Sequence, residues 1–301
     1  MYKLLCQGID LMPYQNNIAW ATDSDTIGTQ ISFDCMKDLF EGAVVSMWTN
    51  DTTEYFRGVI IKKTQKRWTY SYICQDYGFY LKNNEVIKQF NGLAADDAIK
   101  SLLGEAYIQG DICSIPTKIK KIYKKDLSGI IDDILDQATK DQGVKYFKEL
   151  NANILTVRKL SDMIITPQII LPKTIDIDSS IEDMKNRIII TSSGEKDAKI
   201  YATAEDTTKQ DWYGVLSEVQ TIDDKNVAQA QNIADNLLAE KNKIFKSTSF
   251  DVMAVQDAET IRANRLIYLH AGSRLDGYYK IKSARHTMSK GNHKVNISLE
   301  W

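Results

Sequence analysis

One β-rich pattern occurs twice in this chain, once near each end. The first copy occupies residues 56–73 and contains Gly58, and the second occupies residues 275–301 and contains Gly277. In both, an apolar residue stands two positions before the glycine, a stretch with period-two character follows, and an alternating return strand comes after a polar turn. This pattern predicts an antiparallel hairpin with one buried face. Two such hairpins indicate an architecture in which each subunit contributes the same kind of β-sheet wall segment twice.

The two glycines are candidate structural residues. A glycine inside a strand pattern often marks a bend or a close approach of another backbone. We therefore expect Gly58 and Gly277 to have such roles, and we expect bulkier substitutions there to harm folding or assembly.

Composition describes an ordinary globular protein. The 301 residues include 43% hydrophobic and 26% charged residues, which allows two or three domains with an ample core. The net charge of −2 gives no general attraction to nucleic acid or to acidic membranes. No stretch approaches the roughly 18 apolar residues of a membrane span. We therefore expect neither specific nucleic-acid binding nor a membrane anchor.

The largest local departure in charge is a run of five lysines within residues 118–125, which begins at Lys118 and ends at Lys125. Its apolar neighbours include Ile119, Ile122 and Tyr123. A short basic run of this kind is typical of a solvated face with apolar anchors. The sequence leaves its role open.

Changes in periodicity predict the order of the domains. The fold class is mainly β with α+β insertions, in which two similar small β-barrels accompany an α/β domain. The expected segments are a first β-barrel domain at 1–88, an α/β domain at 89–166, the start of a second β-barrel at 167–215, a helical insertion at 216–248 and the completion of that barrel at 249–301.

Three helices and one further hairpin are expected in the middle of the chain. Asp96 or Asp97 is expected to cap the first helix, which carries an apolar stripe from Ala98 to Leu103. The second helix covers residues 127–141, and a hairpin follows at 146–157. The longest apolar stripe predicts a third helix over residues 226–245.

The sequence shows no catalytic constellation, cofactor motif or metal site. There is no phosphate-binding loop, dinucleotide fingerprint or serine nucleophile elbow. The four cysteines, at positions 6, 35, 74 and 113, lack metal-ligand spacing and are expected to be reduced. His286 and His293 flank a turn and are predicted to face each other as wall residues with polar tips, since two histidines alone make a weak metal site.

Several local patterns together resemble one family, the baseplate hub proteins of contractile phage tails and phage-tail-like particles. This late control protein D group is related to the hub part of type VI secretion spike proteins. Order and spacing carry the resemblance over nearly the whole chain. The matching residues are Gly42, Phe56 to Gly58, Tyr70 to Asp76, Leu81, Ser180 to Ile190 with Asn186, Asp206, Tyr213, Gly214, Gly277 and His286.

The resemblance implies a structural baseplate hub without enzymatic activity. The expected assembly is a homotrimeric ring in which each subunit gives two β-barrels, so that the ring adapts a sixfold tail tube to a threefold central spike. The implied partners are the central spike protein, the tail tube protein and the baseplate wedge proteins. The implied location is the host bacterial cytoplasm during synthesis and then the baseplate of a virion or tail-like particle.

Two other functions stay open at this point. A tail-associated cell-wall hydrolase would need a Cys–His or paired-carboxylate site. A carbohydrate-binding β module would need an aromatic platform, for which the candidates are Trp68, Tyr70, Tyr72, Tyr77, Phe79 and Tyr80.

Overall fold

A computed structural model describes residues 2–49, 53–192, 199–222, 224–289 and 292–301. Strands make up 53% and helices 22% of the structure, so the protein is mainly β, as predicted. Among the described residues, no helix has the length and apolar character needed to cross a membrane. The chain divides into two compact units. The first comprises Met1–Asp132, Tyr146–Asp176 and Thr248–Trp301, and the second comprises Asp133–Lys145 and Ile177–Ser247.

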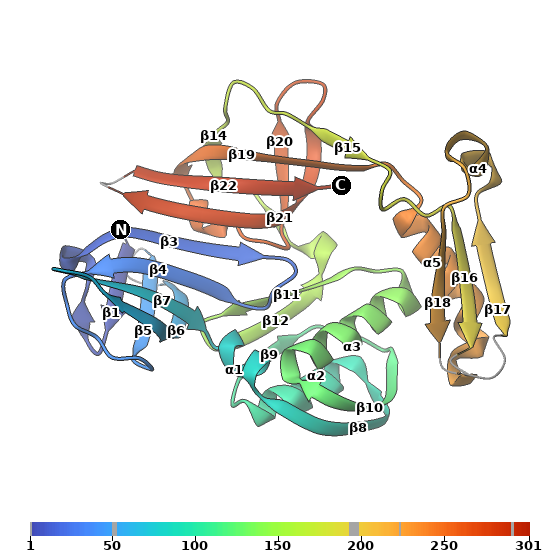
Figure 1. The fold of residues 1–301 in the computed structure, drawn as a ribbon, viewed down its shortest axis with the longest axis horizontal. Coiled ribbons are helices and arrows are strands. Elements are labelled where there is room, and N and C mark those ends of the chain that lie inside the picture. Colours follow the sequence, from blue (N-terminus) through green and yellow to red (C-terminus); the bar gives the residue numbers. More distant parts are fainter. Residues whose placement is uncertain (1, 50–52, 193–198, 223, 290–291) are drawn as a thin grey trace. The chain divides into compact units, whose positions relative to one another are not determined.

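The largest element is a curled sheet of 14 strands among the described residues (Figure 1). Its main path runs β14-β19-β22-β21-β3-β4-β7-β6-β5-β1-β2, and β13, β15 and β20 join at its side. The bounds are β1 Tyr2–Cys6, β2 Ile9–Asp10, β3 Gln15–Asp23, β4 Thr29–Cys35, β5 Val44–Thr49, β6 Thr53–Gln65, β7 Tyr70–Asp76, β13 Ile164–Ile165, β14 Gln168–Ile170, β15 Asp178–Ser180, β19 Phe245–Gln256, β20 Leu266–His270, β21 Asp276–Ser289 and β22 Asn292–Glu300.

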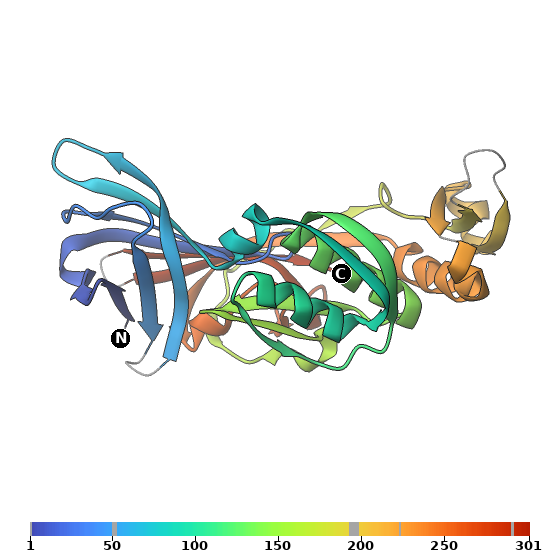
Figure 2. The same ribbon diagram turned by 90° about the horizontal axis from the view of Figure 1, so that it is seen from below.

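Both predicted hairpins are confirmed. The first is the antiparallel pair β6–β7 and the second is the antiparallel pair β21–β22. The turn of the second hairpin includes residues 290–291, which lie outside the described part. The regions that the sequence assigned to two barrels are joined. Strand β3 of the first β module (β1–β7) pairs with β21 of the second β module (β20–β22), so both modules are parts of one continuous sheet. Figure 2 shows how the first module curls.

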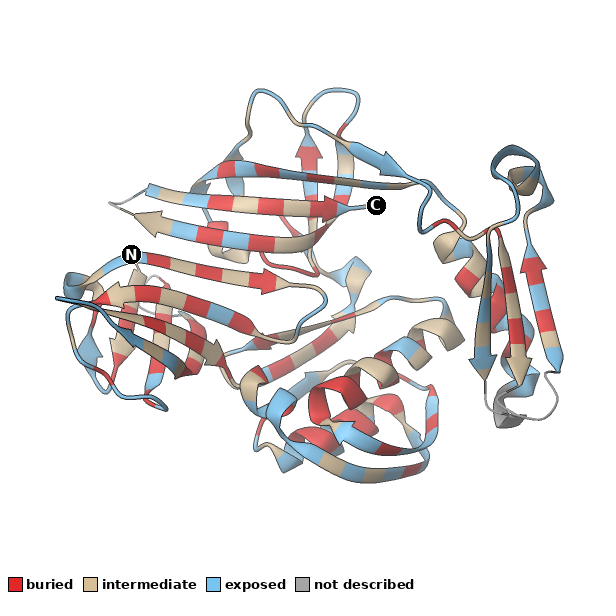
Figure 3. Ribbon diagram, in the orientation of Figure 1, coloured by how far each residue is buried: buried red, intermediate tan, exposed pale blue. Residues whose placement is uncertain are grey.

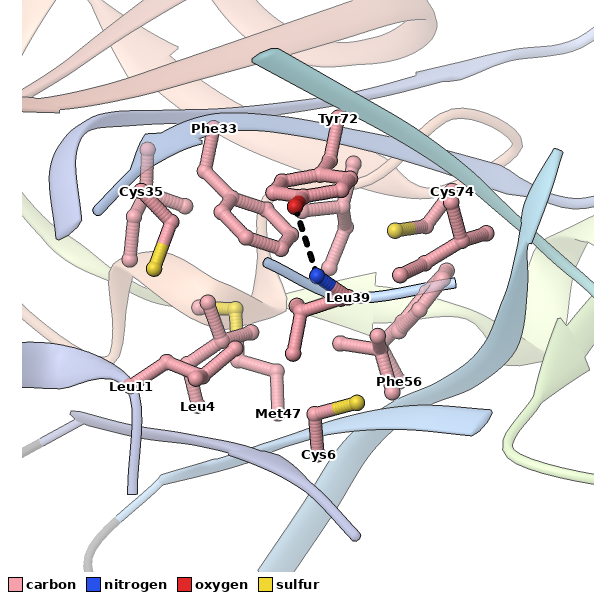
Figure 4. Close-up of a cluster of buried hydrophobic side chains, with 14 of the residues drawn as sticks. Leu4, Cys6, Leu11, Phe33, Cys35, Leu39, Met47, Phe56, Tyr72 and Cys74 are labelled. Atoms are coloured by element: carbon pink, nitrogen blue, oxygen red, sulfur yellow. Dashed lines mark hydrogen bonds between the residues drawn. The ribbon is translucent and has the colours of Figure 1, made fainter. Parts of the chain in front are cut away.

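Alternation of side chains builds the core of the first β module. Along β4, every second residue from Thr29 to Cys35 is buried, which is the period that a strand with one covered face requires. Figure 4 shows Phe33 and Cys35 of β4 within the curled sheet together with side chains of β1, β5, β6 and β7. The buried Tyr72 hydroxyl accepts a hydrogen bond from Leu39 N at 2.8 Å and donates one to Lys37 O at 2.9 Å. The core therefore holds the loop after β4 in place.

The middle of the chain forms two small sheets with helices. The elements are α1 Gly78–Asn83, β8 Glu85–Ala94, α2 Ala95–Glu105, β9 Gln109–Ile112, β10 Lys118–Asp126, α3 Leu127–Gln142, β11 Tyr146–Asn151 and β12 Ile154–Lys159. β8 pairs with β10, while β11, β12 and β9 form a three-stranded sheet. The predicted cap of the first helix is wrong. Ala94 occupies the N-cap, and Asp96 and Asp97 lie in the first turn. Both aspartates contact Lys100, and their negative charge interacts favourably with the positive end of the helix dipole.

The second unit is a three-stranded sheet with a helix on one face. The sheet order is β17-β16-β18, with bounds β16 Arg187–Ser192, β17 Ile200–Glu205 and β18 Ser217–Ile222. Strands β16 and β17, in a segment that the sequence assigned to the start of a second barrel, thus belong to a separate sheet. The helices here are α4 Thr207–Tyr213 and α5 Ala230–Lys241, and α5 buries Ile233 and Leu237 against the sheet.

The predicted helix over 226–245 begins later and ends earlier than expected. A 3-10 segment, η3 Asp224–Gln229, precedes α5, and Phe245 already belongs to β19. Val227 and Ile244, which the sequence placed on the buried stripe, are 38% and 41% exposed. Three other 3-10 turns connect strands, namely η1 Met12–Tyr14, η2 Leu160–Asp162 and η4 Ala258–Thr260. Burial across the fold alternates along the strands, as Figure 3 shows.

Candidate functional site: a buried junction between the two β modules

The two β modules meet where β3 runs antiparallel to β21. The pairing extends from Ser283 opposite Asp23 to Met288 opposite Ile18. It places Trp20 of the first module directly opposite His286 of the second. Residues that are directly opposite in an antiparallel pair lie on the same face of the sheet. The junction therefore brings a large aromatic side chain against an imidazole.

His286 is completely buried and held on three sides. Its ring stacks on Trp20 with centroids 4.7 Å apart and planes 6° from parallel. Its Nε2 lies 2.8 Å from Ile261 O, and because a carbonyl oxygen only accepts, Nε2 carries the proton. The Nδ1 atom of the neutral ring is then an acceptor, and His293 Nε2 donates to it across 2.9 Å.

The protonation of His293 Nε2 also determines the role of the other ring nitrogen of His293. With Nε2 protonated, His293 Nδ1 is an acceptor, and it faces the Tyr2 hydroxyl at 3.5 Å. The same hydroxyl lies 3.3 Å from Glu259 Oε2 and has one proton to donate. Trp20 adds a branch, because its Nε1 donates to the Tyr55 hydroxyl at 3.1 Å. Side chains of the first strand thus reach the last hairpin through polar contacts.

Burial keeps both histidines uncharged near neutral pH. It lowers the pKa of His286 to about 3, an effect that the bond to Ile261 opposes and the neighbouring His293 reinforces. Burial likewise lowers the pKa of His293 to about 4. The prediction that the two histidines face each other is confirmed. The prediction that they are wall residues with polar tips is wrong for His286, whose ring the indole and the adjacent segment cover.

A second polar cluster joins three parts of the chain. Arg262 is 3% exposed, and it contacts Glu149 of β11 at 2.9 Å and donates to Thr29 Oγ1 at 2.9 Å and to Leu150 O at 3.0 Å. Arg265 contacts the same Glu149 carboxylate through two nitrogens, the nearer at 2.8 Å. The two guanidinium groups lower the pKa of Glu149 although burial opposes them. One carboxylate therefore binds both arginines.

Asp76 is a third buried group at this junction. It is 2% exposed and accepts hydrogen bonds from the backbone N–H groups of Thr29 and Gly78. Burial raises its pKa to about 7, against the effect of these donors and of Arg262. Gly28 is required beside it, because a Cβ atom there would lie 2.2 Å from the Asp76 carboxylate. Asp76 thus ties the end of β7 to the start of β4.

The chemistry of this junction is that of a structural joint. Glu149 is paired with both arginines and the two histidines are held neutral, although Arg262 Nε is buried without a hydrogen-bond partner in the described part of the chain. Paired buried polar groups of this kind rigidify the packing around them. Among the described residues, no group of three or more histidines, cysteines and carboxylates is arranged to hold a metal ion. The arrangement can hold two β modules and the intervening α/β segment in a fixed relation.

The residues of the alternative functions are dispersed. Cys74 is completely buried, and burial raises the pKa of its thiol, so it is a poor nucleophile. The proposed aromatic platform does not form one face, because Tyr72 is buried in the core while Trp68 is 76% exposed. Cys6 and Cys35 lie in the same core cluster as Cys74, and all of the cysteines are free thiols.

A cleft of about 480 Å³ lies beside the junction, and its lining residues include five aspartates, namely Asp23, Asp25, Asp76, Asp126 and Asp132. Several already have partners within the fold. Asp25 is paired with Lys282 at 2.7 Å, Asp126 accepts from Gly129 N at 2.8 Å, and Asp132 is ion-paired with Lys148. These contacts account for the carboxylates without any ligand.

The two candidate glycines occupy special backbone positions. A Cβ on Gly58 would lie 2.1 Å from the backbone oxygen of Gln75 in the neighbouring strand. Gly277 has a φ of +148°, in a region that side chains rarely adopt. Their effects on folding and assembly stay a prediction, which this geometry supports.

Sequence reasoning did not find Glu149, Arg262 or Arg265. Arg262 and Thr29 are 233 positions apart, and no local pattern indicates their contact. Asp76 had one available signal, since it lies in the motif shared with hub proteins and is followed two residues later by a glycine.

Comparison with known proteins supports this fold. The chain is 27% identical to the phage-like element PBSX protein XkdQ of Bacillus subtilis strain 168 over 260 residues, which cover 82% of this chain and 78% of that protein. A tail protein from Neisseria meningitidis MC58 has a similar structure, with a TM-score of 0.72 at 12% identity over 100% of this chain and 96% of the other.

A component of a type VI secretion system, the Escherichia coli c3393 protein, is similar as well. It is described as structurally similar to the T4 bacteriophage tail proteins gp27 and gp5. Its TM-score is 0.57 at 8% identity, over 99% of this chain and 76% of the other. These likenesses confirm the resemblance to phage tail and secretion spike proteins at the level of the fold. The profile of the YQBQ-like family matches residues 18–300, and the chain therefore belongs to the YQBQ-like family.

Proposed function

We propose that this protein is a structural component of a phage-tail-type baseplate and acts there as the hub. The observation that carries the proposal is the continuous sheet, in which β3–β21 pairing joins two β modules that each contain the same kind of hairpin. The similarity to the phage-like element protein XkdQ and to the tail protein from Neisseria meningitidis supports a tail component. The proposed role is that of a rigid structural wall.

In this proposal three chains close into a ring. Each chain contributes two β modules, so the ring has pseudo-sixfold symmetry on the face that meets a tail tube protein and threefold symmetry on the face that meets a central spike protein. Wedge proteins surround it. Ring closure by heterologous contacts covers strand edges that would otherwise be exposed. The division into segments 1–88, 89–166, 167–215, 216–248 and 249–301 stays part of this proposal.

The buried junction has a clear purpose in such a ring. A hub must keep its two wall elements at a fixed angle, because a change in that angle would open or distort the ring. Paired charges oppose this change, since pulling the partners apart would leave a buried charge or polar group without its partner.

Light scattering over a concentration series tests the proposal. The expected mass is three times 34.2 kDa, with ring-shaped particles in negative-stain images. A mixture with the cognate spike protein should shift entirely to a larger complex. A protein that stays monomeric with and without the spike protein would refute the trimeric hub. Release of soluble fragments from purified peptidoglycan would instead establish the hydrolase.

A further inference from the structure

The lysine-rich run at 118–125 forms β10, one strand of an antiparallel ribbon whose other strand is β8 (Figure 1). Helix α2 packs on this ribbon and buries Phe90 and Tyr123 on its inner face. Within the described part of the chain, no third strand pairs with either β8 or β10. The ribbon therefore has an outer face and two strand edges that its own sheet leaves uncovered.

The outer face has a regular composition. Alternate residues of β10 place Lys118, Lys120, Ile122 and Lys124 on it. The residues of β8 on the same face are Ile87 opposite Lys124, Gln89 opposite Ile122 and Asn91 opposite Lys120, and Glu85 lies at its end opposite Asp126. The two isoleucines are 58% and 75% exposed, and the three lysines are exposed. None of these three lysine side chains has an ion pair with another described residue.

The remaining lysines of the run serve the fold. Lys121 lies over the Tyr123 ring at 5.2 Å, and Lys125 Nζ lies 3.4 Å from Gly129 O. Both are on the inner face by alternation. The run thus divides into lysines that pack within the fold and lysines that face outward.

Protection of a strand edge explains only part of this pattern. Lysines on an open strand discourage pairing with another chain. That purpose does not account for the isoleucines, because protection alone would favour polar residues at Ile87 and Ile122. A surface with two exposed isoleucines and three lysines without ion pairs to other described residues is complementary to an acidic partner that also has an apolar contact.

We propose that the outer face of the β8–β10 ribbon binds an extended acidic segment of a partner protein. Alternate residues on a strand are about 6.6–6.8 Å apart, so an extended segment with the facing order acidic, acidic, apolar, acidic matches the side chains at 118, 120, 122 and 124. Single-stranded nucleic acid fits less well, since the side chains of this face in β8 and β10 include no aromatic ring on which a base could stack. The proposal is independent of the trimer.

Fluorescence anisotropy with two labelled peptides tests it on the full chain. In one peptide, glutamates and a valine occupy alternate positions in the order given above, with threonines between them. The other has the same composition with its glutamates in one block. We expect the alternating peptide to bind at least about fivefold more tightly, and Lys120→Glu/Lys124→Glu to weaken its binding by about tenfold or more.

Matched variants separate binding from folding. Lys159→Glu/Lys173→Glu makes the same change in net charge at two exposed lysines elsewhere. Its Kd for the alternating peptide should stay within about twofold of the wild-type Kd, once the general effect of the altered net charge is allowed for. Lys120→Gln/Lys124→Gln should also weaken binding, with an unchanged circular dichroism spectrum. Ile122→Ser should weaken binding without changing its salt dependence. Equal binding of the two peptides, or equal loss in the control variant, would overturn the proposal. So would tighter binding of oligothymidylate that the Lys120 and Lys124 variants abolish, because it would assign the face to nucleic acid.

Discussion

Replacement of Glu149 by glutamine removes the carboxylate that Arg262 and Arg265 both contact. The side chains of Arg262 and Glu149 are 3% and 9% exposed, so water cannot replace the lost charge. Removal of one partner from a buried ion pair typically costs about 3–5 kcal/mol, because the remaining charge is left buried without compensation. Here two guanidinium groups lose the same partner. We expect the free energy of unfolding to fall by about 4 kcal/mol, a large share of the total of about 5–15 kcal/mol that is usual for a domain.

Urea unfolding followed by tryptophan fluorescence and by circular dichroism measures this loss. The matched control is Glu218→Gln, which breaks the half-exposed pair between Glu218 and Lys241 at 2.6 Å in the second unit. Exposed or half-exposed pairs contribute about 0–1 kcal/mol, so this control should change the midpoint little. Arg265→Met should cost less than Glu149→Gln, since Glu149 keeps Arg262.

The reasoning would be refuted by a loss below about 1 kcal/mol for Glu149→Gln, or by equal losses in the variant and its control. Either result would mean that the cluster is solvated enough to tolerate an unpaired guanidinium. The pH dependence gives a second check. Because the folded-state pKa of Glu149 is lowered, the stability that it contributes is complete above its unfolded pKa and is lost as the pH falls.

Three further predictions concern the junction and the hairpins. The folded-state pKa of His286 is lowered to about 3, so the stability that its neutral ring contributes is complete above the unfolded pKa of about 6.5. Between pH 7 and pH 5 the free energy of unfolding, followed by urea midpoints, should therefore fall by about 2 kcal/mol through this group. His286→Gln should remove that part of the pH dependence, and an unchanged pH dependence in the variant would contradict the assignment. Gly28→Ala should lower the free energy of unfolding by more than about 2 kcal/mol in thermal unfolding, because the added Cβ would overlap the buried Asp76 carboxylate. The control Gly42→Ala has a similar positive φ with open space around it, and it should cost about 1 kcal/mol. Equal costs for the two variants would count against the close approach at Gly28. Gly58→Val and Gly277→Val should lower the yield of folded protein or of trimer in size-exclusion chromatography, and normal yields for both would reject their structural roles.

Much of the fold could be predicted from local pattern. Alternation along β6, β7, β21 and β22 located both hairpins, and the apolar stripe after Leu127 located α3 almost to the residue. Boundaries were less accurate where local signals compete. The acidic pair at Asp96 and Asp97 fits both a cap and a first turn, and only the backbone at Ala94 decides between them.

The junction could be predicted only in small part. His286 and His293 were expected to meet because a hairpin places them close together. Their burial could not be foreseen, since it depends on Trp20, which arrives from the far end of the chain through the β3–β21 register. The same limit applies to Glu149 and its two arginines, whose ion pairs form after three separate segments have packed.

The sequence by itself determined the mainly β character, the doubled hairpin and the resemblance to a tail protein family, because these depend on side-chain period and on the order of short motifs. Only the tertiary structure decided that the two β modules share one sheet, that β16, β17 and β18 form a separate sheet, and that buried charges hold the junction. The physical reason is range. Strand and helix periods arise among near neighbours, whereas strand pairing and the burial of a charge depend on residues that come together only in the folded chain.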